Sequence, residues 1–523
     1  MSSYDDVPYS VGAFPQTHPD RLATLATLFG MHPAPPDKCR VLELGCAAAG
    51  NLIPMAWAMP ASRFVGVDLS QRQIEDGKRA VAELSLPNLD LRAMSILDVG
   101  PAELGEFDYI LAHGVYAWAP PAVQDRILQI CGEQLAPHGV AYISYNAYPG
   151  WHARGAIREM LWYHTGRFAD PAERVREARG LLAFLADAVP ADDAGFGSLV
   201  RQELALLRMT PDTYLLHEHL EEFNEPLYFH QFIDRAAAKG LQYLGEAQIT
   251  AMVAGRFGAQ TERTLRAISP DLLHMEQYMD FLRNRMFRQT LLCRAHLDVE
   301  HHLRSEAVEG FRVASSAQAD QATTEVASDQ PMTFRGAAGQ GASLTTRDPL
   351  MKAAMAHLSA RWPLPITFGD VLSGARATLG LDGPVIADVS RGLATRLLNC
   401  YASGLVEFSL STPPFVVEAS QRPVASPYAR LRAQTGDRVT NVRLEGVALT
   451  EPSRLVLQNL DGRHDRAALA RLVADWVKKA GPDAAVAAAA ALAAPEADSP
   501  RAPAAVYVDE LLKAFARGAL LVA

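Results

Sequence analysis

The sequence contains no run of 18 or more apolar residues, although 49% of its 523 residues are hydrophobic. A helix needs about 20 such residues to cross a bilayer, so we expect no membrane-spanning helix and no membrane insertion. Residues 1–19 carry Asp5 and Asp6 and lack a basic end followed by an apolar stretch. This composition argues against a secretory signal.

Cysteine is scarce, and its placement excludes the usual disulfide and zinc patterns. The chain has five cysteines without paired spacing: Cys39, Cys46, Cys131, Cys293 and Cys400. We therefore expect reduced, buried thiols in a cytoplasmic protein and no metal. The net charge of -10 argues against a nucleic-acid surface spread over the whole protein.

A regular alternation of short apolar runs and helical patterns occupies residues 40 to 146, in a chain long enough for roughly three domains. It predicts strands at 40–44, 63–67, 89–94, 107–112 and 140–145, the last entered through Pro137-His138-Gly139, and helices at 51–59, 71–84 and 121–135. This order indicates an α/β fold, in which a parallel sheet is covered on both faces. Its ligand is expected at the carboxyl ends of the strands.

A turn of small residues follows the first expected strand. It reads Glu43-Leu44-Gly45-Cys46-Ala47-Ala48-Ala49-Gly50. Small side chains let the backbone approach a ligand closely, because larger ones would occupy the ligand's space. The turn alone also fits a dinucleotide oxidoreductase, since that fold uses the same device.

Two acidic positions further along the chain narrow the choice. Asp68 ends the second expected strand, where its carboxylate can accept hydrogen bonds from both ribose hydroxyls. Ser95-Ile96-Leu97-Asp98 follows the third strand. There the two apolar side chains can enclose an adenine ring and Asp98 can accept from its exocyclic amine.

On these residues the sequence resembles the class I S-adenosylmethionine-dependent methyltransferases over about residues 35–146. The usual turn has three glycines, of which Gly45 keeps the first, while Ala47 and Ala49 replace the others. The resemblance implies S-adenosylmethionine as cofactor and a Rossmann-like, seven-stranded sheet. It also implies that Glu43 contacts the methionine end. The expected cofactor-binding residues are Glu43, Gly45, Ala47, Gly50, Asp68, Leu69, Ile96, Leu97, Asp98 and His113.

A class I sheet needs a closing helix and an antiparallel pair of strands after its fifth strand. Residues 229–239 predict the helix, which Gly240 ends, and residues 241–244 and 287–294 predict the strands. The helical stretches 151–228 and 250–286 would then be insertions over the substrate side. We therefore expect a cofactor-binding core at 1–150 and a helical regulatory region at 151–300 that also completes the sheet.

The C-terminal part predicts a linker and two winged-helix-like α+β units. Residues 301–345 are expected to be the linker, because 314–330 is small and polar. Helices at 349–362, 368–379 and 386–402, followed by a strand at 405–410, indicate the first unit, over 346–420. Helices at 465–476 and 511–522 indicate the second unit, over 421–523. Residues 511–522 repeat the pattern of 397–406, which suggests a duplication, and 481–505 is an Ala/Pro-rich expected loop.

An aromatic segment, Ala112 to Pro120, lies where the methyl acceptor meets the cofactor in class I enzymes. In-line methyl transfer needs positioning and desolvation more than strong acid–base chemistry, and aromatic rings can flank an alkylamine. The predicted catalytic residues are His113, Tyr116, Trp118 and Tyr145, with Trp151 as a further wall. A packing role stays open for Trp118 and Trp151, and shaping the loop is the favoured role for His113.

Further motifs resemble a narrower group, the bacterial methyltransferases with a methyltransferase regulatory domain and a C-terminal winged-helix-like domain. They are Tyr4-Asp5-Asp6-Val7-Pro8-Tyr9, Gln16-Thr17-His18-Pro19, His217-Glu218-His219-Leu220-Glu221, and the segments 228–232 and 240–247. This group includes protein-lysine methyltransferases that act on outer-membrane proteins. The resemblance implies a protein substrate, and lysine is the favoured acceptor.

Two groups of charged or titratable residues have alternative interpretations. His217, His219 and His230 lack a ligand spacing, so we expect hydrogen-bonded or solvated imidazoles and not a metal site. A set of C-terminal arginines could belong to a DNA-reading helix, but acidic neighbours favour a protein-docking module over nucleic acid. These arginines are Arg391, Arg396, Arg430 and Arg432.

Two other functions stay open at this point. One is a small-molecule methyltransferase of a biosynthetic pathway, whose extra domains serve oligomerisation. The other is a non-catalytic, cofactor-sensing or DNA-binding regulator, in view of the two alanines in the turn. More than half of the chain lies outside the core, and this size favours a protein acceptor.

Overall fold

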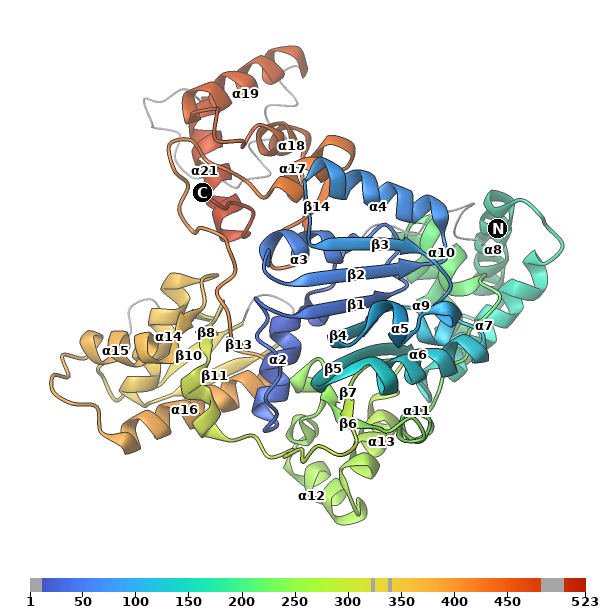
Figure 1. Cartoon of the computed structure of the whole chain (residues 1–523), viewed down its shortest axis with the longest axis horizontal. Helices are drawn as coiled ribbons and strands as arrows, with labels where there is room; N and C mark the ends of the chain where they lie inside the picture. Colours follow the sequence, from blue (N-terminus) through green and yellow to red (C-terminus); the bar gives the residue numbers. More distant parts are fainter. Residues whose placement is uncertain (1–11, 321–324, 337–340, 481–502) are drawn as a thin grey trace.

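A seven-stranded sheet forms the centre of the molecule (Figure 1). The computed structural model describes residues 12–320, 325–336, 341–480 and 503–523. The strand order is β3-β2-β1-β4-β5-β7-β6; β1 to β5 are parallel, and β7 is antiparallel to both β5 and β6. The strands are β1 (Arg40–Leu44), β2 (Arg63–Asp68), β3 (Leu89–Ala93), β4 (Phe107–Ala112), β5 (Leu135–Asn146), β6 (Leu241–Glu246) and β7 (Phe287–Arg294).

Both faces of the sheet are buried, which explains the apolar runs in its strands. Val41 and Tyr109 pack on one face, and their neighbours Leu42 and Ile110 pack on the other. Helices α2 (Pro19–Leu28), α3 (Leu52–Ala58) and α4 (Gln71–Glu83) cover the first face. The second face is covered by α6 (Pro121–Gln134) and α11 (Phe229–Ala237), with the short α5 (Pro101–Leu104) nearby.

The antiparallel end of the sheet forms where the sequence predicts it. After α11, Gly240 adopts a φ of 74°, a left-handed conformation that glycine takes at low cost, and β6 begins at the next residue. Strand β7 then pairs with β5 on one side and β6 on the other. The predicted class I sheet is confirmed, with one local difference. Residues Pro137–Gly139 lie inside the long β5 and do not precede it.

Four helices inserted between β5 and α11 lie beyond the carboxyl ends of β1 to β3 (Figure 1). They pack around an apolar core of their own, which includes Ile157, Leu182 and Val200. The helices are α7 (Gly150–Thr165), α8 (Pro171–Ala188), α9 (Phe196–Met209) and α10 (Asp212–His219). Two further helices, α12 (Ala259–Ile268) and α13 (Leu272–Arg283), precede β7.

The expected linker at 301–345 instead contains strands that belong to the following unit. Strand β8 (Arg312–Ala314) is the central strand of a sheet ordered β12-β8-β13, and Val313 on it is fully buried. The small polar residues that suggested a linker are compatible with strands this short, because pairing partners far along the chain hold them. The other strands are β9 (Gln318–Ala319), β10 (Met332–Arg335), β11 (Ser343–Thr346), β12 (Ile366–Thr367) and β13 (Glu407–Ser409).

Three helices complete this first C-terminal unit, at the positions that the sequence predicts: α14 (Pro349–Arg361), α15 (Phe368–Thr378) and α16 (Ala387–Ser403). The second unit has a separate apolar core. Its elements are α17 (Pro427–Thr435), β14 (Arg438–Thr440), β15 (Gly446–Ala448), α18 (Glu451–Gln458), α19 (Arg466–Ala480) and α21 (Pro503–Arg517). Most of the expected 481–505 loop lies outside the described residues.

The repeated sequence pattern near 400 and 515 corresponds to two similar helix ends. After α16, Gly404 has a φ of 81° and the next amide donates to the carbonyl of Cys400 at 2.8 Å. After α21, Ala519 has a φ of 51° and the next amide donates to Phe515 at 2.9 Å. Both helices therefore end in a left-handed residue that returns the chain toward its own core.

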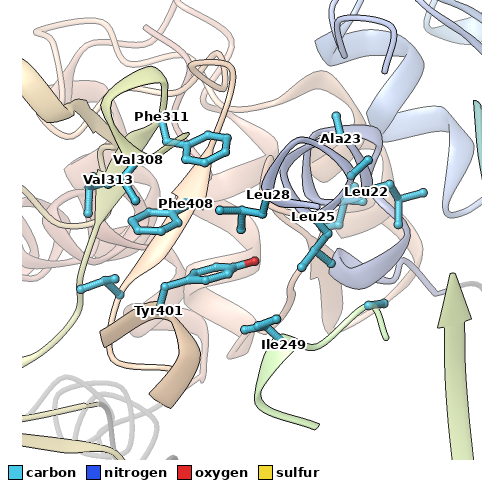
Figure 2. Packing of buried hydrophobic residues seen from close by; sticks show 14 of the residues in the cluster. Leu22, Ala23, Leu25, Leu28, Ile249, Val308, Phe311, Val313, Tyr401 and Phe408 are labelled. Atoms are coloured by element: carbon cyan, nitrogen blue, oxygen red, sulfur yellow. The ribbon is translucent and has the colours of Figure 1, made fainter. Parts of the chain in front are cut away.

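Helix α2 joins the central sheet to the first C-terminal unit (Figure 2). Its Leu25 and Leu28 lie in the same apolar cluster as Ile249, Tyr401 and Phe408. One continuous core therefore extends from the sheet into this unit. Short 3-10 helices cover Pro15–Thr17, Ile96–Asp98, Tyr116–Trp118, Ile249–Ala251, Ala254–Phe257 and Ser305–Gly310. Among the described residues, no helix combines the length and the apolarity that crossing a bilayer requires.

Candidate active site

A cavity of about 1120 Å³ opens at the carboxyl ends of β1, β2 and β4, where the sequence predicts the ligand. Its inner part is lined by the turn after β1, by Asp68 and by His113. Its outer part is lined by the inserted helices, including Trp151 and Trp162 of α7. The cavity is large enough for a nucleoside cofactor and an acceptor side chain together.

The turn after β1 has the backbone of a glycine turn although two of its residues are alanines. Gly45 has a φ of 75°, and Ala47 and Ala49 have φ values of 49° and 58°. A Cβ at Gly45 would lie 2.4 Å from Cγ2 of Val115, so only glycine fits there. The two alanines thus adopt the left-handed conformation that glycines usually supply, at a cost in backbone strain.

Asp68 fixes this turn from the end of β2. Its Oδ2 accepts a hydrogen bond from the amide of Ala47 at 2.8 Å, and its Oδ1 accepts one from the amide of Ser70 at 2.9 Å. The exposed Leu69 and the buried Gln73 also line the cavity. The carboxylate therefore sits at the cavity wall, in the position expected of a ribose acceptor.

The predicted adenine-binding triplet only partly reaches the cavity. Ser95 and Ile96 line it, whereas Leu97 is 50% exposed and, like Asp98, lies outside the lining. These residues form a 3-10 helix, in which consecutive side chains point about 120° apart. The lining therefore includes Ser95 and Ile96 but not Leu97 and Asp98, and the adenine contacts of Leu97 and Asp98 stay a prediction.

Glu43 is the buried acid of the site, with 3% of its surface exposed. Its Oε1 accepts a hydrogen bond from Nδ2 of Asn51 at 2.8 Å, and among the described residues Oε2 has no hydrogen-bond partner. Asn51 also bonds Thr17 and accepts from the amide of Phe14 at 3.0 Å. Burial raises the pKa of Glu43 to about 8, against the opposing effect of Asn51. A carboxyl held this way fits the ammonium at the methionine end of the cofactor.

His113 lies between the cofactor side and the sheet. Its Nδ1 is 2.9 Å from the hydroxyl of Tyr142 and 3.2 Å from that of Ser144, and its ring lies 3.9 Å from that of Phe14. Burial lowers the pKa of His113 to about 4, so the imidazole is neutral at pH 7. In this environment His113 is better suited to shaping the loop than to accepting a proton.

Tyr116 and Tyr145 are not brought to the cavity, contrary to their predicted place in an acceptor channel. Both are fully buried behind it and pack on Phe232 of α11, with ring centroids 5.3 and 4.1 Å away. Tyr145 lies on β5 with its side chain toward the face that α11 covers. Burial raises the pKa of Tyr116 to about 12, so it stays protonated.

Trp118 and Trp151, in contrast, do line the cavity. Their rings meet edge to face with centroids 5.8 Å apart. The guanidinium of Arg154 lies 5.6 Å from the Trp151 ring and pairs with Glu203 at 3.0 Å. His219 bonds the same carboxylate at 2.7 Å, so a buried chain of polar contacts fixes the orientation of this wall.

Several cavity residues were not predicted from the sequence: Phe14, Asn51, Val115, Glu218 and Phe287. Asn51 had a local signal, because it directly follows Gly50 and is the first polar residue after the turn. Val115 lies in the expected acceptor segment, whereas Phe14, Glu218 and Phe287 reach the cavity from distant segments, which no local pattern reveals. The motif Tyr4–Tyr9 lies outside the described residues.

Two of the remaining predicted residues, His230 and Arg396, have protein partners. Nδ1 of His230 is 2.9 Å from Oε1 of Gln277. Arg396 pairs with Asp348 at 3.1 Å on the first C-terminal unit. No group of three or more His, Cys, Asp or Glu suited to a metal occurs within the described part of the chain.

Three family models match successive parts of the chain. They are described as a methyltransferase domain, over residues 41–139, a predicted methyltransferase regulatory domain, over 211–294, and the C-terminal winged helix domain of PKMT, over 421–520. The last covers most of the second C-terminal unit. Together they follow the order that the sequence motifs predict.

One relative aligns with most of the chain. The uncharacterized protein RP789 of Rickettsia prowazekii is 33% identical over 482 residues, which is 91% of this chain and 86% of that protein. The chain belongs to the class I S-adenosylmethionine-dependent methyltransferases with a regulatory domain and a C-terminal winged-helix domain. A shorter protein, RP028 of the same organism, is 40% identical over 242 residues, or 46% of this methyltransferase and 96% of that protein.

A solved structure matches this methyltransferase over its whole length. PKMT2 from Rickettsia typhi is 29% identical, with a TM-score of 0.85, and the match covers 99% of this chain and 100% of that one. PKMT2 has also been solved in complex with AdoHcy. The cofactor of this methyltransferase is S-adenosylmethionine, and the turn, Asp68 and Glu43 are the groups in the cavity that fit it.

Proposed function

We propose that this methyltransferase transfers a methyl group to a protein acceptor, and specifically to a lysine side chain. S-adenosylmethionine supplies a methyl group on a positively charged sulfur, which a neutral amine can attack. The observation that carries the proposal is the continuation of the cavity past the cofactor residues, between Trp118, Trp151 and Trp162. A long side chain can enter such a passage while its own backbone stays outside.

The tryptophan walls supply what an amine acceptor needs. Aromatic faces attract an alkylammonium as it enters and exclude water from its methylene groups, which favours loss of the charge near the reaction centre. Trp162 is 45% exposed, so the passage reaches the protein surface. The full-length match to PKMT2 supports a macromolecular acceptor, as does the large part of the chain outside the core.

Methyl-labelled S-adenosylmethionine tests the proposal directly. The full-length protein is incubated with a lysate from which small molecules have been removed, and the labelled peptides are mapped by mass spectrometry. We expect label on lysine, and loss of the label in Asp68→Asn but not in Asp90→Asn, an exposed acid on the neighbouring strand that does not line the cavity. Label that appears only when small molecules are restored would show a small-molecule methyltransferase instead.

We further propose that the enzyme works in the cytoplasm. All five cysteines are free and buried, as in proteins of reducing compartments. Fractionation of cells that produce the natural protein, followed by detection with a specific antibody, checks this placement. Recovery with the periplasmic or secreted fraction would contradict it.

A further inference from the structure

The outer half of the cavity is built by two inserted helices that face each other. Helix α7 supplies Trp151, Arg154 and Trp162, and helix α10 supplies Tyr214 and Glu218. Both helices lie beyond the carboxyl ends of the strands, on the side from which an acceptor would enter (Figure 1). An acceptor that enters through this outer half passes beside these helices.

The basic groups that line this passage are engaged with the protein itself. Arg154 pairs with Glu203 at 3.0 Å, and Arg174 donates to the carbonyl of Leu220 at 3.0 Å. Glu218, Glu221 and Glu222 also line the passage. Glu221 lies 3.8 Å from Nδ1 of His217, so the outer half presents the carboxylates of Glu218 and Glu222 to an incoming group.

Glu218 has an unfavourable place for a carboxylate. It lies in the last turn of α10, where unpaired carbonyl groups make the helix end negative. Its side chain is half-buried and lines the cavity. Burial raises its pKa, although Arg154 and His217 oppose this effect, and Glu203 adds to it.

This placement is explained if a cation binds beside the Glu218 carboxylate. Arg154 and His217 lie within electrostatic range of Glu218, but Arg154 is already paired with Glu203 at 3.0 Å, so an incoming cation would add a partner for the Glu218 carboxylate. An ammonium is the cation that fits here, because the tryptophan rings nearby can cover the methylene groups of an alkyl chain.

We infer that Glu218 is a specificity-determining residue that receives the ammonium of the acceptor side chain as it enters the passage. This inference rests on the proposed lysine acceptor and adds the group that recognises its charge. Glu218 acts on substrate capture, and the methyl transfer itself takes place deeper in the cavity. Replacing its carboxylate should therefore change KM much more than kcat.

Steady-state kinetics of Glu218→Gln, measured with a protein that the wild-type enzyme methylates, test this role. Loss of a charged hydrogen bond predicts a rise in KM of about 10-fold to 100-fold, with kcat within about threefold and unchanged affinity for S-adenosylmethionine. Glu159→Gln is the matched control, because Glu159 is an exposed acid on α7 outside the cavity lining. Equal KM values in the two variants would overturn the inference.

A binding measurement separates this inference from the proposed function. Butylammonium is titrated into the enzyme saturated with S-adenosylhomocysteine, without any turnover. We expect wild type and Glu159→Gln to bind it alike, and Glu218→Gln at least about tenfold more weakly. Equal binding by all three would exclude Glu218 as the ammonium site, whatever wild type methylates. If Glu218→Gln alone loses butylammonium binding while wild type labels no lysine, only the proposed lysine acceptor would be refuted.

Discussion

Nδ2 of Asn51 donates a hydrogen bond to Oε1 of Glu43 at 2.8 Å, and this contact closes the inner end of the cofactor cavity. Asn51 bonds the N-terminal segment at Thr17 and Phe14 as well, so one side-chain amide joins the acid of β1 to that segment. The Glu43 carboxyl has a pKa of about 8, mainly because it is buried. It is therefore mostly protonated at pH 7 when no cation is bound.

Cofactor affinity should depend on pH through Glu43. An ammonium beside the carboxyl favours the ionised form, so binding at pH 7 should release up to about one proton. The affinity should then rise between pH 6 and about 8, by up to tenfold per pH unit, and level off where an α-amino group loses its own proton, near pH 7.7–8.0. Isothermal calorimetry in two buffers of different ionisation enthalpy measures this proton release.

Glu43→Gln supplies the control for this pH effect. Glutamine keeps the shape of the side chain and the hydrogen bond from Asn51 but cannot ionise. The affinity of the variant for S-adenosylmethionine should therefore be lower than that of wild type above pH 8 and independent of pH between pH 6 and 7.5. The free wild-type enzyme should also lose stability as pH rises from about 4.5 to 8, because the folded state holds this proton and the unfolded state does not. Cofactor binding without proton release in wild type would contradict the assignment.

Ala47→Gly should stabilise the protein. An L-residue in the left-handed region costs about 1–2 kcal/mol, whereas glycine costs about 0.5–1 kcal/mol in unfolded-state entropy, which leaves a net gain of about 0.5–1 kcal/mol. Ala49→Gly should gain less, because the Ala49 methyl is fully buried. Ala48→Gly is the control and should destabilise, since Ala48 does not have a positive φ. Thermal unfolding of the three variants checks this order.

The central sheet and the cofactor turn could be predicted because their signals are local. Val41 and Leu42 are both buried, so β1 appears in the sequence as a short, mainly apolar segment that Glu43 interrupts. The turn itself could be predicted. The positive φ of Ala47 was harder to predict, since alanine is a poor but tolerated substitute for glycine in this conformation. Local chemistry thus determined the fold and the inner half of the site.

The outer half of the site depends on contacts that no local pattern contains. Tyr145 looks like a channel residue, but its strand directs it toward the face covered by α11. Glu218 reaches the cavity from an insertion whose helices lie beyond the strand ends, far from the cofactor turn in sequence. Strand β8 has three residues, and its central position follows from pairing with β12 and β13, which lie 50 to 100 residues later.

Arg288 should be essential for the stability of the regulatory region. It is fully buried and pairs with Glu246 and Asp280 at 2.7 Å and with Glu276 at 3.1 Å. Arg288→Met would leave three buried acids without their common partner, which predicts a loss of about 3–5 kcal/mol. Thermal unfolding, with hydrogen exchange over 272–294, measures the loss.

The pH dependence of Arg288→Met identifies the cause of this loss. Burial already raises the pKa of Glu276 to about 7, and removal of the arginine should raise it further. The variant should therefore lose more stability at pH 8, where the acids are ionised, than at pH 6. Arg304→Met, which removes an exposed partner of Glu300, should cost at most about 1 kcal/mol at either pH. A loss independent of pH would indicate packing instead of charge.

Asp20 should hold the first C-terminal unit against the catalytic core. It lies in the first turn of α2, and its carboxylate accepts from the amides of Leu410 at 2.7 Å and Ser411 at 3.0 Å, and from the Ser411 hydroxyl. Asp20→Ala leaves these donors without their acceptor, at a cost of about 1–3 kcal/mol. Hydrogen exchange should increase at residues 405–411 and in α2, while the exposed Asp37→Ala changes neither. Because the same N-terminal segment bonds Asn51, the affinity for the cofactor should also fall in Asp20→Ala. Unchanged cofactor affinity together with faster hydrogen exchange would show that the two ends of the segment act independently.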